Sequence, residues 1–600
     1  MKKNIKRSLS YVLASLVFMN SAAAFAASAE EIPEIPQFGF IETEKSDNTG
    51  YISDRYVDES GSEIVFEEPE ELPLYCCSAD SLSVPTSFDS REEGLVTVAK
   101  DQGSTNNCWI FSTISVLESD SIAKNITNIE NTDFSEAHLS WFASRVATNN
   151  ESDTTYGDGQ NIESPYLKGG NWRIVTAALA RRSGLANEND FPFFSDNISA
   201  MGNYSEAERY NHDSGAILES AQELTDVNEI KEWITEHGSI SAAYYHSSKM
   251  YNSENYSYYG NLDNASNHQI TVIGWNDEYP AENFSKSGSI PAGDGAWLCQ
   301  NSWGTDWGDN GCFWISYYDC TLSDFYGFTA RSTKEYYKNY SYNGAEYNTF
   351  LIDENLSGAA NVFKSGGNEN LSSVSFYTLS SDVFIRINIY KNLPEGYTNP
   401  SQGELAATLE QTFDHKGFHT LYLDSPLSLE PGEIFSVTVN YSHPSGEVYI
   451  PIERNSSSRT YHGNKYETFI LNIPGTNSWY PSSLHGFQNA YIQVTTECEH
   501  CCESHVSSES TCIKNGTAAE ICTICGKTVN ESFLPLEAHE YGEWSEYHHD
   551  NKSGKEVSTR KCIVCGTVQT QSYFSGNTIT LYDLIMKIFG SMFEIFKNFR

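Results

Sequence analysis

Hydrophobic and polar positions follow different periods in different parts of the chain. After Cys108, apolar residues recur at helical spacing in "WIFSTISVLESD", and they do so again in "RIVTAALARRSGL". Later segments, "HQITVIGW" and "CFWISYY", have the short apolar runs that are typical of strands. Helices followed by strands predict an α+β domain over residues 84–331.

Helical spacing disappears between residues 335 and 496. Short β-rich runs such as "VFIRINIY" and "IFSVTVNY" are separated by turns rich in Gly, Pro, Asn and Ser. The alternation is clearest from Val383 to Ile389, where Arg386 and Asn388 stand between apolar residues. This pattern predicts an antiparallel β-sandwich.

An internal repeat occupies residues 497–574. "CTICGKTVNESF" from Cys522 and "CIVCGTVQTQSY" from Cys562 share both cysteines, the glycine and a Ser-aromatic pair, at an offset of 40 residues (522 to 562). Two copies of one small Cys/His-rich, zinc-ribbon-like module are the simplest account. In the last segment, 578–600, apolar residues recur at helical spacing opposite charged ones, which predicts an amphipathic helix. We expect it to dock on protein, with contact to a membrane surface as the alternative.

The first 83 residues differ from the rest of the chain. A basic start, a short apolar run and "AFA" at Ala24–Ala26 predict a signal peptide over residues 1–26, because the apolar run is too short to span a bilayer. Secretion to the cell surface or the extracellular space follows from it. Residues 27–83 are acidic and contain four prolines. They are either an inhibitory pro-segment or a plain linker.

Composition narrows the classes of function. The 600 residues include 37 Lys+Arg and 80 Asp+Glu, a formal net charge of -43, so nucleic acid is not an expected partner. A hydrophobic content of 39% is that of a folded chain, and the length requires several domains. Eight of the 14 cysteines lie between Cys498 and Cys565, which indicates separate chemistry in the repeats.

Five residues together offer the elements of cysteine catalysis. Cys108 stands where a helix is expected to begin, so the helix dipole favours its thiolate and a backbone N–H faces a developing oxyanion. Gln102 offers the oxyanion a second donor, and His268 stands at the mouth of a predicted strand as the base. Asn301 is placed to orient the imidazole of that base, with Trp303 shielding the pair from water.

The order of these motifs resembles the papain-like cysteine protease family. "QGSTNNCWIFS", "NHQITVIGW" and "NSWGTDWGDNGCFWI" occur in the family's order, with weaker echoes such as "GGNWRIVTAAL" between them. The resemblance covers about Val84 to Tyr318. It implies a two-lobed domain, with a helical lobe and a β-barrel-like lobe, that needs no cofactor for catalysis.

The resemblance also implies a role for each matching residue. Cys108 would be the nucleophile and His268 the general acid/base, while Gln102 would line the oxyanion hole and Asn301 would orient His268. The residues implied to bind or flank an extended substrate are Gly169, Gly170, Asn267 and Trp303.

Two features depart from the family pattern. Thr105, Asn106 and Asn107 stand where the family has Cys-Gly-Ser, so the disulfide that usually shapes this loop is lost. The 160 residues from Cys108 to His268 exceed the roughly 130–150 that are typical, which insertions such as "NSENYSYYGNLDNAS" explain.

The β-rich region resembles the lectin-like domain that accompanies papain-like proteases in some Gram-positive surface proteins. The resemblance implies contact with cell-wall or host glycans, or a calcium site. A sandwich that only positions substrate is the alternative, because acidic residues alone do not make a calcium site.

The C-x2-C pairs of the repeats have the spacing that holds tetrahedral Zn²⁺. We expect structural zinc, with disulfides as the competing interpretation for an exported protein. Other cysteines and histidines nearby, Cys512 among them, are also available, so no set of four is fixed. The predicted ligands are Cys498, Cys501, Cys522, Cys525, Cys562, Cys565 and His539.

These features predict a secreted cysteine endopeptidase that hydrolyses protein or peptide substrates through an acyl-enzyme. The alternative is a surface adhesin or glycan-binding protein whose protease domain only trims its own N-terminal segment. An inactive protease fold is disfavoured, because no candidate catalytic position has been replaced.

Overall fold

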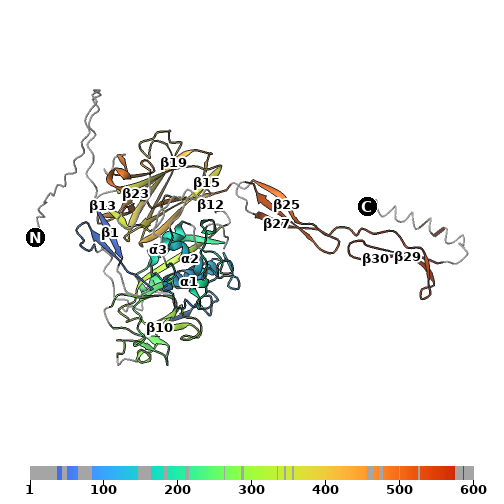
Figure 1. The fold of residues 1–600 in the computed structure, drawn as a ribbon, viewed down its shortest axis with the longest axis horizontal. Coiled ribbons are helices and arrows are strands. Elements are labelled where there is room, and N and C mark those ends of the chain that lie inside the picture. Colours follow the sequence, from blue (N-terminus) through green and yellow to red (C-terminus); the bar gives the residue numbers. More distant parts are fainter. Residues whose placement is uncertain are drawn as a thin grey trace, which may run out of the picture.

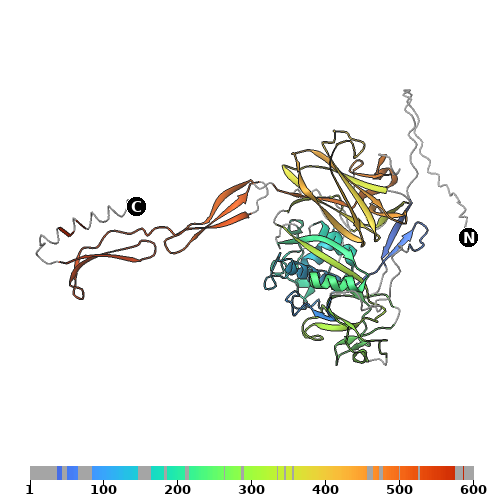
Figure 2. The same cartoon turned by 180° about the vertical axis from the view of Figure 1, so that it is seen from behind.

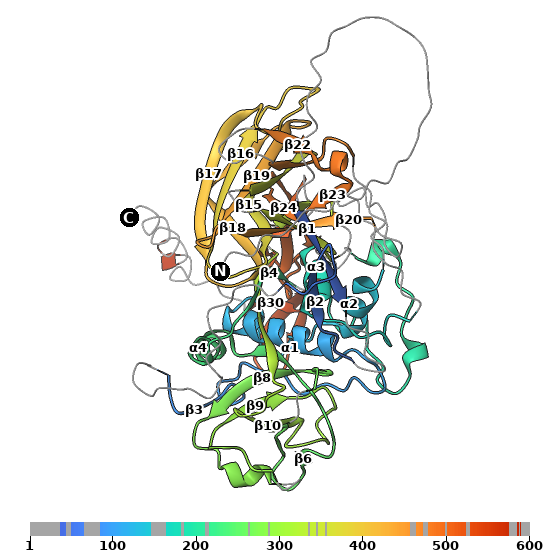
Figure 3. The same cartoon turned by 90° about the vertical axis from the view of Figure 1, so that its left-hand side faces the viewer.

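Helix α1 (Cys108–Ala123) lies at the centre of the computed structural model, with one region of strands above it and another below (Figure 3). Nearly all of its side chains are buried, as expected for a helix that is covered on all sides. The structure describes residues 37–43, 50–64, 84–145, 164–181, 185–209, 215–261, 264–285, 289–333, 336–343, 346–353, 357–455, 464–471, 478–498, 501–523, 528–574, 585–586 and 589.

Three further helices begin at side chains that cap them. The Ser135 hydroxyl accepts from the backbone N–H of His138 before α2 (Glu136–Ala143), and the Asn171 side chain accepts from Ile174 before α3 (Trp172–Ala180). Helix α4 (Val227–His237) ends at Gly238, whose φ of 85° closes the helix in the left-handed region. Short 3₁₀ turns lie at Ile198–Ala200, Glu206–Arg209, Ala281–Phe284 and Ser482–His485.

The strands below α1 form the second lobe of the protease region. The segments predicted as strands form strands in the structure. "HQITVIGW" lies within β8 (His268–Asn276), and the first five residues of "CFWISYY" form β10 (Cys312–Ser316). Aromatic and β-branched side chains fill the space between them, with Trp275 and Trp297 fully buried. The other strands of this lobe are β3 (Ser87–Asp89), β5 (Ile240–Tyr244), β6 (Tyr251–Asn252), β7 (Ser257–Tyr258) and β9 (Ala296–Gln300). Strands β11 (Ser323–Ser332) and β4 (Ala216–Glu223) continue the same sheet towards the sandwich, with β4 above α1 (Figure 3).

The strands above α1 form an antiparallel sandwich. The alternation predicted from Val383 to Ile389 is confirmed in β16 (Val383–Lys391), where the odd-numbered residues from Val383 to Ile389 are buried and Arg386 is exposed. The remaining strands of the sandwich are β12 (Tyr336–Tyr340), β13 (Thr349–Asp353), β14 (Ser357–Lys364), β15 (Glu369–Thr378), β17 (Glu404–Phe413), β18 (Gly417–Leu429), β19 (Ile434–Ser442), β20 (Val448–Arg454), β21 (Thr468–Leu471), β22 (Trp479–Pro481), β23 (Phe487–Ala490) and β24 (Ile492–Glu497).

The two regions share one sheet. Its strand order is β12-β24-β15-β18-β4-β11-β5-β8-β9-β10-β7-β6, and the regions meet where β18 pairs with β4. Gly417 of β18 lies at this junction, where the two strands come very close. A Cβ there would lie only 2.1 Å from the carbonyl oxygen of Ala221, so the position requires glycine. The expected α+β protease region and β-sandwich are therefore both present, and they are joined edge to edge.

An N-terminal hairpin adds two strands to the sandwich. Strand β1 (Gln37–Thr43) pairs antiparallel with β13 on one side and with β2 (Asp54–Asp58) on the other. Residues 50–52, which precede β2 in the chain, contact the protease region through hydrogen bonds to Gly170 and Asn267. The N-terminal segment is thus attached to both regions at once.

The repeats form an arm that extends away from the main body (Figures 1 and 2). Each repeat is a three-stranded antiparallel sheet, the first of β25 (Cys502–Ser508), β26 (Gly516–Cys522) and β27 (Thr528–Leu534), the second of β28 (His548–Asp550), β29 (Lys555–Lys561) and β30 (Val568–Tyr573). The predicted signal peptide and most of the predicted C-terminal helix lie outside the described residues. Within the described part of the chain, no helix has the length and apolar content needed to cross a membrane.

Candidate active site

Cys108 is the first residue of α1 and is fully buried. Backbone N–H groups of Gln269, Trp109 and Cys108 itself approach its sulfur and favour the thiolate, but burial outweighs them and raises the pKa of the Cys108 thiol to about 12. The nucleophile predicted from sequence therefore sits at a helix N-terminus, as expected, in a form that holds its proton.

His268, the first residue of β8, lies beside Cys108, since the next residue, Gln269, directs its N–H at the sulfur. Its Nε2 lies 2.8 Å from Oδ1 of Asn301, which leaves Nδ1 for the cysteine. Trp303 stacks on the imidazole with ring centroids 4.9 Å apart. Burial lowers the pKa of His268 to about 4, although the Asn301 hydrogen bond acts in the opposite direction. Base, orienting amide and shielding indole are thus brought together.

Hydrogen bonds hold the loop from Gln102 to Asn107, which lacks the cysteine that the family usually has there. The Gln102 side-chain amide donates to the Thr105 carbonyl at 2.7 Å, and the Thr105 hydroxyl returns a bond of 2.7 Å to the Gln102 carbonyl. The Ser302 hydroxyl donates to Gln102 Oε1 at 2.6 Å. The Gln102 side chain is therefore fixed on both sides, and Ser302, which sequence reasoning passed over within "NSWG", is one of its supports.

Gly170 lines the cleft on the side opposite His268. A Cβ at Gly170 would lie 2.6 Å from the Trp109 indole, so glycine lets the backbone of this segment pack directly against that ring. Gly169 is buried next to it. Across the cleft, the carbonyl of Asn267 faces the same space and accepts a backbone N–H at 3.3 Å. Gly170 and Asn267 therefore face one cleft from opposite sides, while substrate binding by Gly169, Gly170, Asn267 and Trp303 stays a prediction.

The protein's own residues 50–52 fill this cleft. Gly170 donates to the Gly50 carbonyl at 3.1 Å and accepts from Ile52 at 3.2 Å, and Tyr51 donates to Asn267 at 3.3 Å. The Tyr51 ring is buried and its hydroxyl donates to Asp324 at 2.5 Å. Sequence reasoning did not find this segment, because its bonds to the cleft run mostly through backbone atoms.

A buried ion pair holds the segment just beyond the cleft. Arg173 of α3 donates to both carboxylate oxygens of Asp54, at 2.7 and 2.8 Å, and its side chain is 1% exposed. The same guanidinium donates to the Tyr347 carbonyl at 2.7 Å, next to the sandwich. Arg173 thus links the N-terminal segment, the helical lobe and the sandwich.

His246 is a further residue that sequence reasoning missed. Its ring lies 4.7 Å from that of Trp303 and 6.2 Å from that of His268. Its backbone N–H donates to the Asn267 side chain at 2.7 Å, which fixes the residue that precedes His268. A lone histidine after β5 carries no motif, so only the fold reveals this contact.

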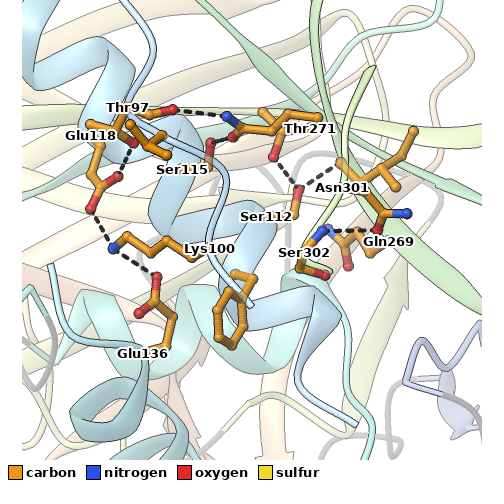
Figure 4. Close-up of a pocket in the computed structure, with 14 residues that line it drawn as sticks. Thr97, Lys100, Ser112, Ser115, Glu118, Glu136, Gln269, Thr271, Asn301 and Ser302 are labelled. Atoms are coloured by element: carbon orange, nitrogen blue, oxygen red, sulfur yellow. Dashed lines mark hydrogen bonds and ion pairs between the residues drawn. The ribbon is translucent and has the colours of Figure 1, made fainter. Parts of the chain in front are cut away.

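A cavity lined mainly by polar residues, Asn301 among them, lies beside the predicted catalytic residues, between α1 and strands β8 and β9 (Figure 4). At one end, Lys100 bridges the carboxylates of Glu118 and Glu136, each at 2.9 Å. In the middle, the Ser112 hydroxyl of α1 donates to the Ile270 carbonyl of β8 at 2.7 Å. The Ser112 bond ties α1 to β8, and hence Cys108 at the start of α1 to His268 at the start of β8.

The repeat cysteines gather in two places. The Cys498 and Cys522 sulfurs lie 3.7 Å apart, with Cys501 beside them in the chain, and Cys525 lies outside the described residues. Cys562, Cys565 and His539 lie close together beside the second repeat, where Cys512 of the first repeat joins them.

For the lectin-like region, calcium remains a prediction.

This fold and this cleft define a cysteine protease domain of the papain type joined to a lectin-like sandwich. The family described as "Papain family cysteine protease" matches residues 84–326, and that described as "Lectin like domain" matches residues 340–490. The expected fold class is confirmed. Residues 84–326 are a papain-family cysteine protease domain.

Particular relatives agree with this assignment. Two structures of the clostridial protease Cwp84 superpose on about 70% of the chain. One, of its cysteine protease and lectin-like domains from Clostridium difficile, has a TM-score of 0.55 at 24% identity and is covered to 90%. The other, determined after propeptide cleavage, has a TM-score of 0.56 at 25% identity over 69% of this chain and 99% of that one.

Two curated relatives match about two fifths of the chain. The probable cysteine protease RDL6 of Arabidopsis thaliana is 27% identical over 38% of this chain and 54% of its own length. Cathepsin L1 of Drosophila melanogaster is 25% identical over 43% of this chain and 58% of its own. The chain thus spans somewhat more than half the length of these relatives.

Proposed function

We propose that the chain is a cysteine endopeptidase that is made in a closed form, with residues 50–52 occupying its own cleft. The observation that supports the activity best is the convergence of Cys108, His268, Asn301 and Gln102 on one cleft whose walls bind an extended backbone. The family match of residues 84–326 agrees with it.

The geometry supports a two-step hydrolysis. Once the cleft is open, Cys108 passes its proton to His268 Nδ1, and the thiolate attacks the peptide carbonyl carbon. The carbonyl oxygen takes up the electron pair and is held by the Gln102 amide and the Cys108 N–H. The C–N bond then breaks, with His268 protonating the leaving amine. Water, deprotonated by His268, finally cleaves the thioester and restores the thiol.

Of the two interpretations of residues 27–83, the contacts favour an inhibitory pro-segment. A plain linker has no reason to bury Tyr51 in the cleft or to pair Asp54 with a buried arginine. Cwp84, one of whose structures was determined after propeptide cleavage, supports a cleavable pro-segment by analogy.

We place the protein at the cell surface or in the extracellular space, where its substrates would be proteins. Support comes from the predicted signal peptide and from Cwp84, which is described as a surface layer associated protein. The lectin-like domain adds glycans of the cell wall or of a host as partners.

The test is multiple-turnover cleavage of a fluorogenic peptide library by the processed chain, together with labelling by a thiol-directed epoxide. Wild type should turn over and take up one label, and Cys108→Ala should do neither. Cys320→Ser, at an exposed cysteine away from the cleft, is the matched control and should behave as wild type. Undiminished cleavage by Cys108→Ala would overturn the proposal. Self-trimming without turnover of added substrate would favour the adhesin instead.

A further inference from the structure

The two repeats of the arm meet at four ligand-type side chains. Cys512 belongs to the loop between β25 and β26 of the first repeat, and Cys562 and Cys565 to the turn between β29 and β30 of the second. His539 lies in the connection between the repeats. Their sulfur and nitrogen atoms all lie within 4.8 Å of one another.

The spacing of these atoms is that of a tetrahedral metal site. The Cys512 and Cys562 sulfurs are 3.7 Å apart, and Cys565 Sγ lies 3.3 Å from Nδ1 of His539. Four ligands at the usual Zn–S distance of about 2.3 Å place neighbouring sulfurs about 3.8 Å apart, whereas a disulfide requires about 2.05 Å. Cys565 Sγ also contacts the Thr567 hydroxyl, at 3.0 Å.

Backbone hydrogen bonds hold the second repeat in this shape. The Gly566 N–H, at a φ of 74°, donates to the Cys562 carbonyl at 2.9 Å and closes the turn that carries both cysteines. Ile563 donates to the Glu540 carbonyl at 2.9 Å, which places His539 against that turn. The second repeat and the connection before it thus hold three of the four side chains together.

The fourth ligand comes from the first repeat. Next to Cys512, the Thr511 carbonyl accepts the Glu537 N–H at 3.1 Å, so the loop reaches the chain just before His539. The sequence offset of 40 residues predicts a metal site within each repeat. The structure instead places Cys512 outside the group of Cys498 and Cys522 and within that of the second repeat.

We propose that Cys512, His539, Cys562 and Cys565 bind one Zn²⁺ that joins the two repeats. A soft Cys₃His set of this geometry favours Zn²⁺ over Ca²⁺ or Mg²⁺. The second repeat exposes Tyr573, Phe574 and Val564, so it has little apolar core of its own, and a metal supplies the stability that burial does not. The zinc fixes the second repeat relative to the first.

The experiment measures bound zinc per chain in the full-length protein carrying Cys108→Ala, which prevents self-cleavage. Cys512→Ser and His539→Ala should each lose one equivalent, and the double variant should lose no more than one. Cys320→Ser is the control and should lose none. Replacement with Co²⁺ should give the visible absorption of a tetrahedral thiolate site in the parent and lose one site's share of it in each variant.

Two results would overturn the proposal. One is a double variant that loses two equivalents, which would assign the residues to different sites. The other is a Cys512–Cys562 disulfide found by mass spectrometry of peptides from the unreduced protein. Because single variants could disorder the second repeat, proteolysis between residues 535 and 547 is also followed. Chelator should increase cleavage there in the parent, and zinc should restore protection.

Discussion

Gly50 lies directly against the sulfur of Cys108, so close that a Cβ at Gly50 would stand 2.5 Å from Sγ. The glycine lets the backbone pass over the nucleophile, and its carbonyl is held by Gly170. The closed form therefore depends on one position without a side chain.

Gly50→Ala should open the cleft. The added methyl overpacks a filled site, at a cost of about 1–3 kcal/mol to docking of the segment, which corresponds to roughly 5- to 150-fold weaker inhibition. The rate of Cys108 alkylation in the uncleaved chain measures this directly. Glu59→Ala, exposed in the same hairpin, should leave the rate unchanged. Equal rates for the two variants would show that Gly50 does not control access.

Asp54→Asn should release the segment through electrostatics. Arg173 keeps its charge when the carboxylate is removed, and breaking a buried ion pair costs about 3–5 kcal/mol. The uncleaved variant should therefore show peptidase activity that the parent lacks. Glu42→Gln removes the exposed pair with Arg55 in the same hairpin, where both side chains are about half exposed, and should change little. Similar activation by Asp54→Asn and Glu42→Gln would show that burial of the Asp54–Arg173 pair does not hold the segment in place.

Acid should loosen the closed form. Burial lowers the pKa of His268 to about 4 and that of His246 to about 3, so both imidazoles are neutral when the segment is docked. The open state binds more protons between pH 6.5 and 4, and docking of the segment weakens as pH falls through this range. Binding of a synthetic peptide of residues 37–64 to the processed chain, measured from pH 7.5 to 4, should show the loss. His246→Gln should make the dependence shallower, and affinity that is flat with pH would refute this.

Gln102→Ala should lower kcat by about 10²–10³ and leave KM nearly unchanged, because the amide stabilises charge that develops only in the transition state. Ser302→Ala removes the hydroxyl that fixes Gln102 and should lower kcat less. Steady-state kinetics of the processed chain give both values. A rise in KM at constant kcat would assign Gln102 to substrate binding instead.

The protease domain could be predicted because each of its candidate catalytic residues lies in a short sequence motif. Cys108 begins a helix, His268 begins a strand, and Asn301 directly follows β9, so each lies in a short motif whose order is informative. The alternation in β16 could be predicted for the same reason, because the period of a strand is visible in a few consecutive residues.

The remaining features depend on contacts between distant segments. Gly50 and Tyr51 meet the cleft through backbone hydrogen bonds, which leave no trace in side-chain type. Cys512 joins Cys562 across the repeat boundary, where internal similarity suggests the opposite grouping. Pairing of β18 with β4 likewise rests on the meeting of two edges rather than on a motif.

Strand β1 is hydrogen bonded into the lectin-like sandwich between β13 and β2. A single cut between residues 64 and 84 would therefore sever the covalent bond without removing the inhibitor, which stays clamped as a separate peptide. On the proposed function, latency would end in two stages, a cut followed by a dissociation that dilution promotes and excess peptide reverses. Any ligand of the lectin-like domain that displaces β1 from β13 would set the timing of the second stage.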